Sequence, residues 1–157
     1  MPLRDPFSYY SIVALMCSRP LECSVAEQLR VLLADDNPAI LDVLKQLLQK
    51  EFRILAALKD GSEVVRDAPT LKPDVIVLDI SMGDLNGFEV TRKLHASHCT
   101  SKIIFLTVHE ELEFIRAAFD AGASGYVFKS RMNTDLREAI QAVQSGKVFI
   151  PQAPIPQ

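Results

Sequence analysis

The sequence predicts an α/β fold in which helices cover both faces of an open, doubly wound five-stranded parallel sheet. Short apolar runs alternate with segments of helical periodicity from about residue 28 onward, as in a chain of repeated βα units. Polar side chains directly follow four of the five runs, at the strand ends where open parallel sheets bind ligands. We predict strands over 31–34, 53–57, 75–78, 103–106 and 126–128.

Each predicted strand is followed by a segment with helical features. Asn37 and Pro38 supply an N-cap and a first-turn proline for the first helix. We expect the second helix to be short and terminated by Pro69 and Pro73. Apolar stripes predict the other three helices, which run from Phe88 to Leu94, from Leu112 to a stop at Gly122, and from about Thr134 to a stop at Gly146.

Right-handed crossovers leave few sheet topologies for such a chain. The flavodoxin-like strand order 2-1-3-4-5 fits the positions of the polar residues best. It places strand 53–57, which ends without a reactive group, at the edge of the sheet. It also brings Asp35 and Asp36 next to Asp79 at the switch point of the sheet.

The composition indicates one folded domain with irregular ends. The chain has 157 residues, of which 48% are hydrophobic and 24% charged, as in an ordinary globular protein. We assign 28–147 to the domain, 1–27 to a flexible N-terminal extension and 148–157 to a Pro-rich linker or tail. The first segment could also reflect a misplaced start, since Met16 lies close before the fold.

Charge and hydropathy exclude several functions. A formal net charge of −3, with scattered Lys and Arg, argues against direct binding of nucleic acid or of an anionic membrane. The apolar stretch 12–17 is too short to span a bilayer, and no signal peptide stands out, so we expect a cytoplasmic protein. Cys17, Cys23 and Cys99 lack metal-ligand spacing and are expected to stay reduced.

The acidic residues predict a metal site. Three carboxylates held within a few ångströms repel one another, so one must be protonated or a cation must be present. Their hard oxygen atoms favour Mg²⁺. We expect Asp36 to bind the metal directly, Asp35 to bind it through water, and the Ser81 backbone carbonyl to be a further ligand beside Asp79.

The same strand ends predict phosphoryl chemistry. Asp79, alone at the end of the central strand, is the natural nucleophile toward phosphorus and yields an aspartyl phosphate. Lys129 can neutralise one phosphoryl oxygen, and the Thr107 hydroxyl can donate a hydrogen bond to another.

With Asp35, Asp36, Asp79, Thr107 and Lys129 in this order, the chain resembles the receiver domain of two-component response regulators. The run 121–126, Ala-Gly-Ala-Ser-Gly-Tyr, supports the resemblance, which covers most of the chain from about residue 29 to residue 146. It implies that a phosphohistidine on a sensor histidine kinase or a phosphotransfer protein donates the phosphoryl group to Asp79, and that Mg²⁺ is required.

The resemblance also implies a conformational switch. Thr107 would move toward the phosphate and Tyr126 would turn inward, which remodels the face formed by the helix from Leu112, the strand 126–128 and the last helix. We expect this face to support homodimerisation. Many receivers carry a proline at the position of Ser130. The serine here and the run 146–151 are similar to those of receivers joined to helix-turn-helix DNA-binding domains. Without the proline, it is open whether the Lys129–Ser130 peptide bond is cis.

Two other functions compete with a phosphorylation-activated receiver. A phosphohydrolase usually carries a second Asp two residues after its nucleophile, and Ser81 occupies that position here. A phosphorylation-independent interaction module with the same fold generally loses an acidic residue or the Lys, and this chain retains them. His109, two residues after Thr107, could tune the lifetime of the phosphorylated form or could be a solvated loop residue.

Overall fold

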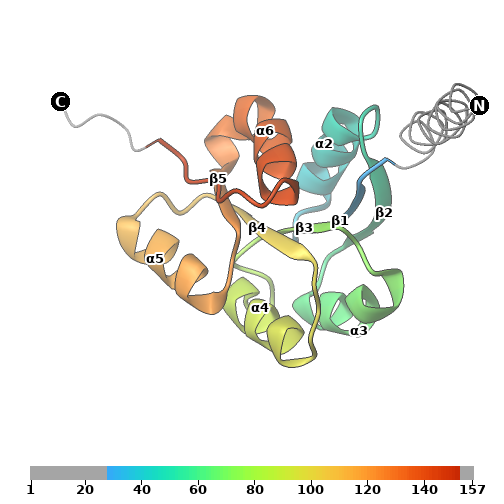
Figure 1. Ribbon diagram of the computed structural model, residues 1–157, viewed down its shortest axis with the longest axis vertical. Helices are drawn as coiled ribbons and strands as arrows, with labels where there is room; N and C mark the ends of the chain where they lie inside the picture. Colours follow the sequence, from blue (N-terminus) through green and yellow to red (C-terminus); the bar gives the residue numbers. More distant parts are fainter. Residues whose placement is uncertain (1–27, 153–157) are drawn as a thin grey trace, which may run out of the picture.

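The computed structural model describes residues 28–152, so the predicted extension 1–27 and residues 153–157 of the predicted tail lie outside the described residues. Five parallel strands form one sheet in the order β2-β1-β3-β4-β5 (Figure 1). The strands are β1 (Arg30–Ala34), β2 (Arg53–Leu58), β3 (Val75–Leu78), β4 (Lys102–Thr107) and β5 (Gly125–Phe128). The predicted fold class and strand order are therefore confirmed.

Helices cover both faces of the sheet (Figure 1). One face carries α2 (Pro38–Leu48) and α6 (Met132–Gln144); the other carries α3 (Gly61–Leu71), α4 (Gly87–Ala96) and α5 (Leu112–Ala121). A short 3₁₀ helix, η1 (Lys129–Arg131), joins β5 to α6. The described residues contain no cis peptide bond, so Lys129–Ser130 is trans. None of the described helices has the length and apolar character needed to cross a membrane.

Two apolar cores result from the two covered faces. Leu32 and Ile76 belong to the core under α3, α4 and α5, whereas their neighbours Val31 and Val77 belong to the core under α2 and α6. Successive strand residues point to opposite faces, so a strand that is buried on both sides must be apolar throughout. This explains why the predicted strands appear in the sequence as continuous apolar runs.

The helix ends show where local sequence signals decide the structure. The Asn37 side chain caps α2 by accepting a hydrogen bond of 2.9 Å from the Ala39 N–H, as predicted. The prediction that Pro69 terminates the next helix was wrong, because α3 continues through it to Leu71. Pro69 lies in the last turn, where the lost N–H removes one hydrogen bond without stopping the helix. The helix ends at Lys72, which adopts the left-handed conformation with φ 50°.

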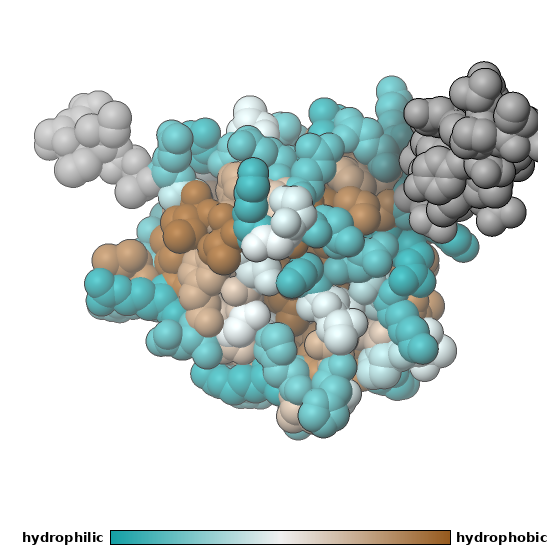
Figure 2. All heavy atoms as spheres, viewed as in Figure 1, coloured by the Kyte–Doolittle hydropathy of each residue, from teal (hydrophilic) through white to brown (hydrophobic). Residues whose placement is uncertain are grey.

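The chain after α6 returns to the open edge of β5. The Phe149 N–H donates a hydrogen bond of 3.1 Å to the Ser124 carbonyl, and the Tyr126 N–H donates one of 3.0 Å to the Phe149 carbonyl. On either side of Phe149, Val148 and Ile150 remain 60% and 61% exposed. Figure 2 shows apolar surface on the side of the molecule where this segment passes between α5 and α6.

Candidate functional site

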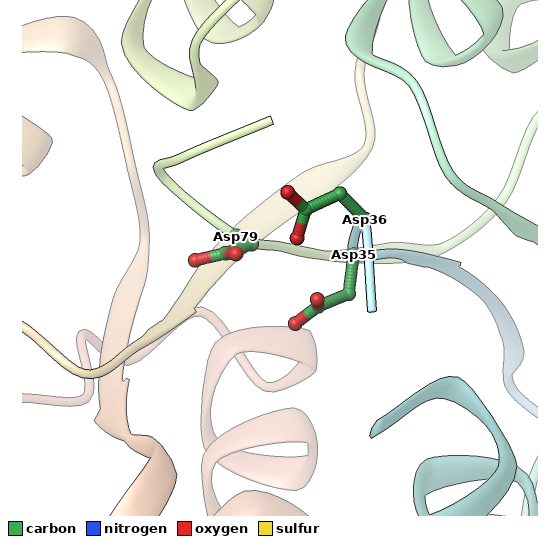
Figure 3. Close-up of side chains that lie close together, drawn as sticks. All are labelled: Asp35, Asp36 and Asp79. Atoms are coloured by element: carbon green, nitrogen blue, oxygen red, sulfur yellow. The ribbon is translucent and has the colours of Figure 1, made fainter. Parts of the chain in front are cut away.

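The carboxyl ends of β1 and β3 bring three carboxyl groups together (Figure 3). Parallel pairing aligns Ala34 with Leu78, and the Asp79 N–H donates a hydrogen bond of 3.0 Å to the Ala34 carbonyl. Asp35, Asp36 and Asp79 follow directly and offer carboxylate oxygens that all lie within 4.8 Å of one another. The sheet topology thus creates the acidic cluster from residues that are far apart in the sequence.

Two of the three carboxyl groups are buried. Asp35 and Asp79 are 1% and 5% exposed, whereas Asp36 lies on the surface. One oxygen of each buried carboxyl accepts a backbone hydrogen bond: Asp35 Oδ1 from the Asn37 N–H at 2.9 Å, and Asp79 Oδ1 from the Ile80 N–H at 2.8 Å. These bonds fix both side chains and leave the Oδ2 atoms available for other partners.

Lys129 supplies the positive charge of the site. Its Nζ lies 2.6 Å from Asp35 Oδ2 and 3.3 Å from Asp79 Oδ2, so one ammonium group bridges the two buried carboxylates. Burial alone would lower the pKa of Lys129, but the contacts with Asp35 and Asp79 outweigh it and raise the pKa. The ammonium group therefore stays charged at neutral pH.

Burial also raises the pKa of Asp79. The positive charge of Lys129 opposes this shift, the negative charge of Asp35 adds to it, and the pKa of Asp79 ends above its ordinary value. Asp79 is therefore harder to ionise than an ordinary Asp, and the pairing of β1 with β3 places it beside a second carboxyl group, that of Asp35. Such perturbed groups are typical of functional sites.

The residues present fit a divalent cation. Three carboxylates against one ammonium leave an excess of negative charge, and every candidate ligand is a hard oxygen atom. Within the described part of the chain, the buried Asp35 Oδ2 has an ion-pair contact with Lys129 but accepts no hydrogen bond of regular geometry. Asp36 stands on the open side of the cluster, where water or a phosphoryl oxygen can approach.

Thr107 and Tyr126 are linked through the backbone of His109. Thr107 is fully buried at the end of β4, and its Oγ1 accepts a hydrogen bond of 3.2 Å from the His109 N–H. The buried Tyr126 donates a hydrogen bond of 2.8 Å from its hydroxyl to the His109 carbonyl. The imidazole of His109 stacks on Phe114 with ring centroids 4.1 Å apart. The two candidate switch residues therefore share one loop, and the Tyr126 side chain, which the resemblance expects to turn inward, is already buried in this structure.

Gly87 is a site residue that the sequence analysis did not single out. A Cβ atom at this position would lie 2.5 Å from the Asp79 carbonyl oxygen. The Gly87 N–H also donates a hydrogen bond of 2.7 Å to the Ile80 carbonyl. A glycine at the first position of α4 thus lets the helix approach the backbone of Asp79. Ser81 lies on the surface between these elements, and its carbonyl ligand role stays a prediction.

Comparison with known sequences identifies the class of protein that has this fold and site. The sequence model of the response regulator receiver domain matches residues 31–141, most of the chain. The chain therefore belongs to the response regulator receiver family of two-component systems, as its resemblance implied. The phosphorylation-independent module is not favoured.

Individual relatives of this chain are response regulators and transcriptional activators. The chain is 34% identical to a nitrate/nitrite response regulator protein homolog of Haemophilus influenzae over 126 residues, which is 79% of this chain and 61% of that protein. It is 29% identical to the DNA-binding transcriptional activator EvgA of Escherichia coli, over 78% of this chain and 61% of EvgA. Across five such relatives the chain spans 53–61% of the relative's length.

Solved structures agree with the sequence relatives. A two-component response regulator of the LuxR family from Aurantimonas superposes with a TM-score of 0.76 at 30% identity, covering 82% of this chain and 91% of that one. The isolated receiver domain of RcsB from Salmonella enterica, solved with the phosphomimetic BeF₃⁻, gives 0.74 at 27% identity, covering 81% and 96%. Both structures are therefore similar to this chain in sequence and in fold.

Proposed function

We propose that this chain is a phosphorylation-activated receiver that accepts a phosphoryl group on Asp79. An Asp79 oxygen attacks the phosphorus of a phosphohistidine on a sensor histidine kinase or phosphotransfer protein. The new bond is P–O, the P–N bond breaks, and the released imidazole nitrogen takes up a proton. The chain catalyses only its own phosphorylation and dephosphorylation.

The position of Lys129 between Asp35 and Asp79 is the observation that carries this proposal. Its ammonium group lies 3.3 Å from Asp79 Oδ2, where it can stabilise the negative charge that gathers on the transferred group. Thr107 lies at the neighbouring strand end and can contribute its hydroxyl to another phosphoryl oxygen. The site thus offers a nucleophile and two groups that bind a phosphoryl group.

The acidic cluster supports a requirement for Mg²⁺. Asp35, Asp36 and Asp79, with the Ser81 carbonyl, are the residues that would hold it. When bound, the ion neutralises phosphoryl oxygens and relieves the repulsion among the carboxylates. Asp35, fixed by the Asn37 N–H, then keeps the ligand set in place.

The switch is proposed to act through Thr107 and Tyr126. Because both contact the backbone of His109, a shift of Thr107 toward the phosphate changes the loop against which the Tyr126 hydroxyl is held. The face formed by α5, β5 and α6 is the proposed homodimer surface. Relatives named as transcriptional regulators lead us to propose that this receiver controls transcription through an output region not contained in the described residues.

Intact mass spectrometry after incubation with Mg²⁺ and acetyl phosphate tests the proposal. We expect a single phosphoryl adduct on the wild-type chain and none on Asp79→Asn, whose amide is a poor nucleophile. The matched control is Asp74→Asn, the same change at the opposite end of β3, which should be phosphorylated like wild type. An adduct on Asp79→Asn, or none on the wild type even with a histidine kinase as donor, would contradict the assignment.

A further inference from the structure

Lys129 lies where the last residue of β5, Phe128, passes into a weak piece of backbone. Lys129 is the first residue of η1, which is only three residues long. The Met132 N–H closes this turn by bonding to the Lys129 carbonyl. Short 3₁₀ turns have poor hydrogen-bond geometry, so η1 by itself is a loose support for a side chain whose Nζ must reach two carboxylates.

A group of three side chains, Arg131, Thr134 and Asp135, tethers η1 to the first turn of α6. We call this group the Arg131 clamp. Arg131 Nε donates a hydrogen bond of 3.0 Å to Asp135 Oδ2, and its second nitrogen, Nη2, lies 3.5 Å from Asp135 Oδ1. The Thr134 Oγ1 has two acceptors in reach, the Arg131 carbonyl at 3.1 Å and Asp135 Oδ1 at 3.0 Å. The single hydroxyl proton of Thr134 serves one acceptor at a time, so Asp135 holds the Arg131 side chain and Thr134 lies within reach of the Arg131 carbonyl.

Burial anchors the clamp on the α6 side. Asp135 is only 9% exposed, and its neighbour Leu136 lies fully buried in the core between α6 and the sheet. Arg131, in contrast, is on the surface. The rigid end of the clamp is thus the helix, and the end that it restrains is the turn that begins with Lys129.

We infer that Asp135 is a positioning residue for the phosphoryl site: through Arg131 it holds η1 so that Lys129 Nζ stays between Asp35 and Asp79. The functional consequence rests on the proposed phosphorylation of Asp79. Displacements of about 1 Å can reduce catalysis ~100-fold in rigid sites, so the tether of a charged group matters even at a distance.

The competing explanation is that Asp135 merely stabilises the start of α6. An acidic residue in the first turn interacts favourably with the helix dipole and needs no Arg131 for this effect. The two explanations differ for Arg131→Gln, which leaves Asp135 in place and breaks only the charged tether. If Asp135 acts only on the helix, Lys129 Nζ should keep its contacts with Asp35 and Asp79 in this variant. If the clamp positions Lys129, Nζ should lose these contacts.

Chemical labelling of lysines measures this release directly in the full-length chain. We expect an amine-reactive reagent to label Lys129 slowly in the wild type, because its Nζ contacts two carboxylates and the side chain is 15% exposed. Arg131→Gln and Asp135→Ala should each speed this labelling about tenfold relative to the exposed Lys102, as peptide mass spectrometry would report. Asp135→Glu should restore much of the protection.

Arg137→Ala is the matched control, because it removes another ion pair of α6, the one with Glu51 at 3.4 Å, and should leave Lys129 labelling unchanged. Unchanged labelling in Arg131→Gln, or an equal increase at Lys102 and Lys129, would overturn the inference. The assay needs no phosphodonor, so a wild-type chain that fails to phosphorylate would refute the proposed function and leave this result readable. If Asp79 is phosphorylated, Arg131→Gln should also slow the Mg²⁺-dependent reaction with acetyl phosphate about tenfold. The free energy of unfolding should stay the same.

Discussion

Strand β3 carries an aspartate at each end, and the two have different surroundings. Asp74 precedes the strand, accepts a hydrogen bond of 2.9 Å from the Arg30 N–H and pairs with Arg30 Nε at 3.6 Å. These two side chains are 30% and 39% exposed. Asp79 follows the strand and pairs with Lys129, and here the side chains are only 7% and 15% exposed. The same residue type is thus solvated at one end and desolvated at the other.

The neighbours explain why we propose a reactive carboxylate at only one of the two ends. Asp74 has a cation and a backbone donor beside it, an arrangement that joins the starts of β1 and β3 and adds little to stability. Asp79 shares its cation with a second buried carboxylate, Asp35, so charge is concentrated where the sheet could have been apolar. A fold retains such a cost where charge is used, as in binding a cation or a phosphoryl group.

The two ends should differ most in free energy of unfolding when the cationic side chain at each end, Lys129 or Arg30, is replaced. Lys129→Met leaves two buried carboxylates without a counter-charge, and we expect a loss of about 3 kcal/mol in the free energy of unfolding at neutral pH without divalent cations. Arg30→Met, at the exposed end, should cost less than about 1 kcal/mol. Urea unfolding in a metal chelator checks both. Equal losses at the two ends would show that burial does not separate the pairs.

Removing the charge of Asp79 should raise the free energy of unfolding, whereas removing the charge of Lys129 should lower it. Because the pKa of Asp79 is raised in the folded chain, its ionised form destabilises the fold, and Asp79→Asn should gain about 1 kcal/mol at neutral pH. In the wild type the folded state binds a proton before the unfolded chain does, so its stability rises as pH falls through the raised pKa. The advantage of Asp79→Asn should therefore shrink with falling pH and level off below the ordinary value of 3.8. A constant advantage across this range would exclude the raised pKa as its cause.

The strands, the polar residues that follow them and the strand order could all be predicted from the sequence. Strands buried on both faces must be apolar throughout, so their ends are visible as abrupt changes to polar residues such as Asp79 and Thr107. The strand order followed from the need to place those ends side by side. The prediction at Pro69 was wrong because tertiary packing of Val64 and Ala68 carries α3 past a residue whose local preference is to stop it.

The supporting contacts could not be predicted from the sequence. Arg131 and Asp135 have the spacing of an ordinary pair on a helix surface, and only the burial of Asp135 distinguishes the clamp from such a pair. The link between Tyr126 and the His109 carbonyl depends on the path of a loop, which residue types do not specify. Gly87 has a sequence signal, a glycine at a helix start, but its close contact with Asp79 appears only in three dimensions.

The smallest expected effect sharpens the comparison most, because it uses the same substitution as the previous test. Asp74→Asn keeps an oxygen that can accept the hydrogen bond from the Arg30 N–H and removes only the charge. An exposed ion pair is screened by salt, so we expect a loss below about 0.5 kcal/mol that disappears in 1 M salt. Thermal unfolding of the two Asn variants at low and high salt makes this measurement. A gain in stability, as expected for Asp79→Asn, would mean that the amino end of β3 also carries unfavourable charge. Unfavourable charge would then not distinguish the end at which we propose phosphorylation.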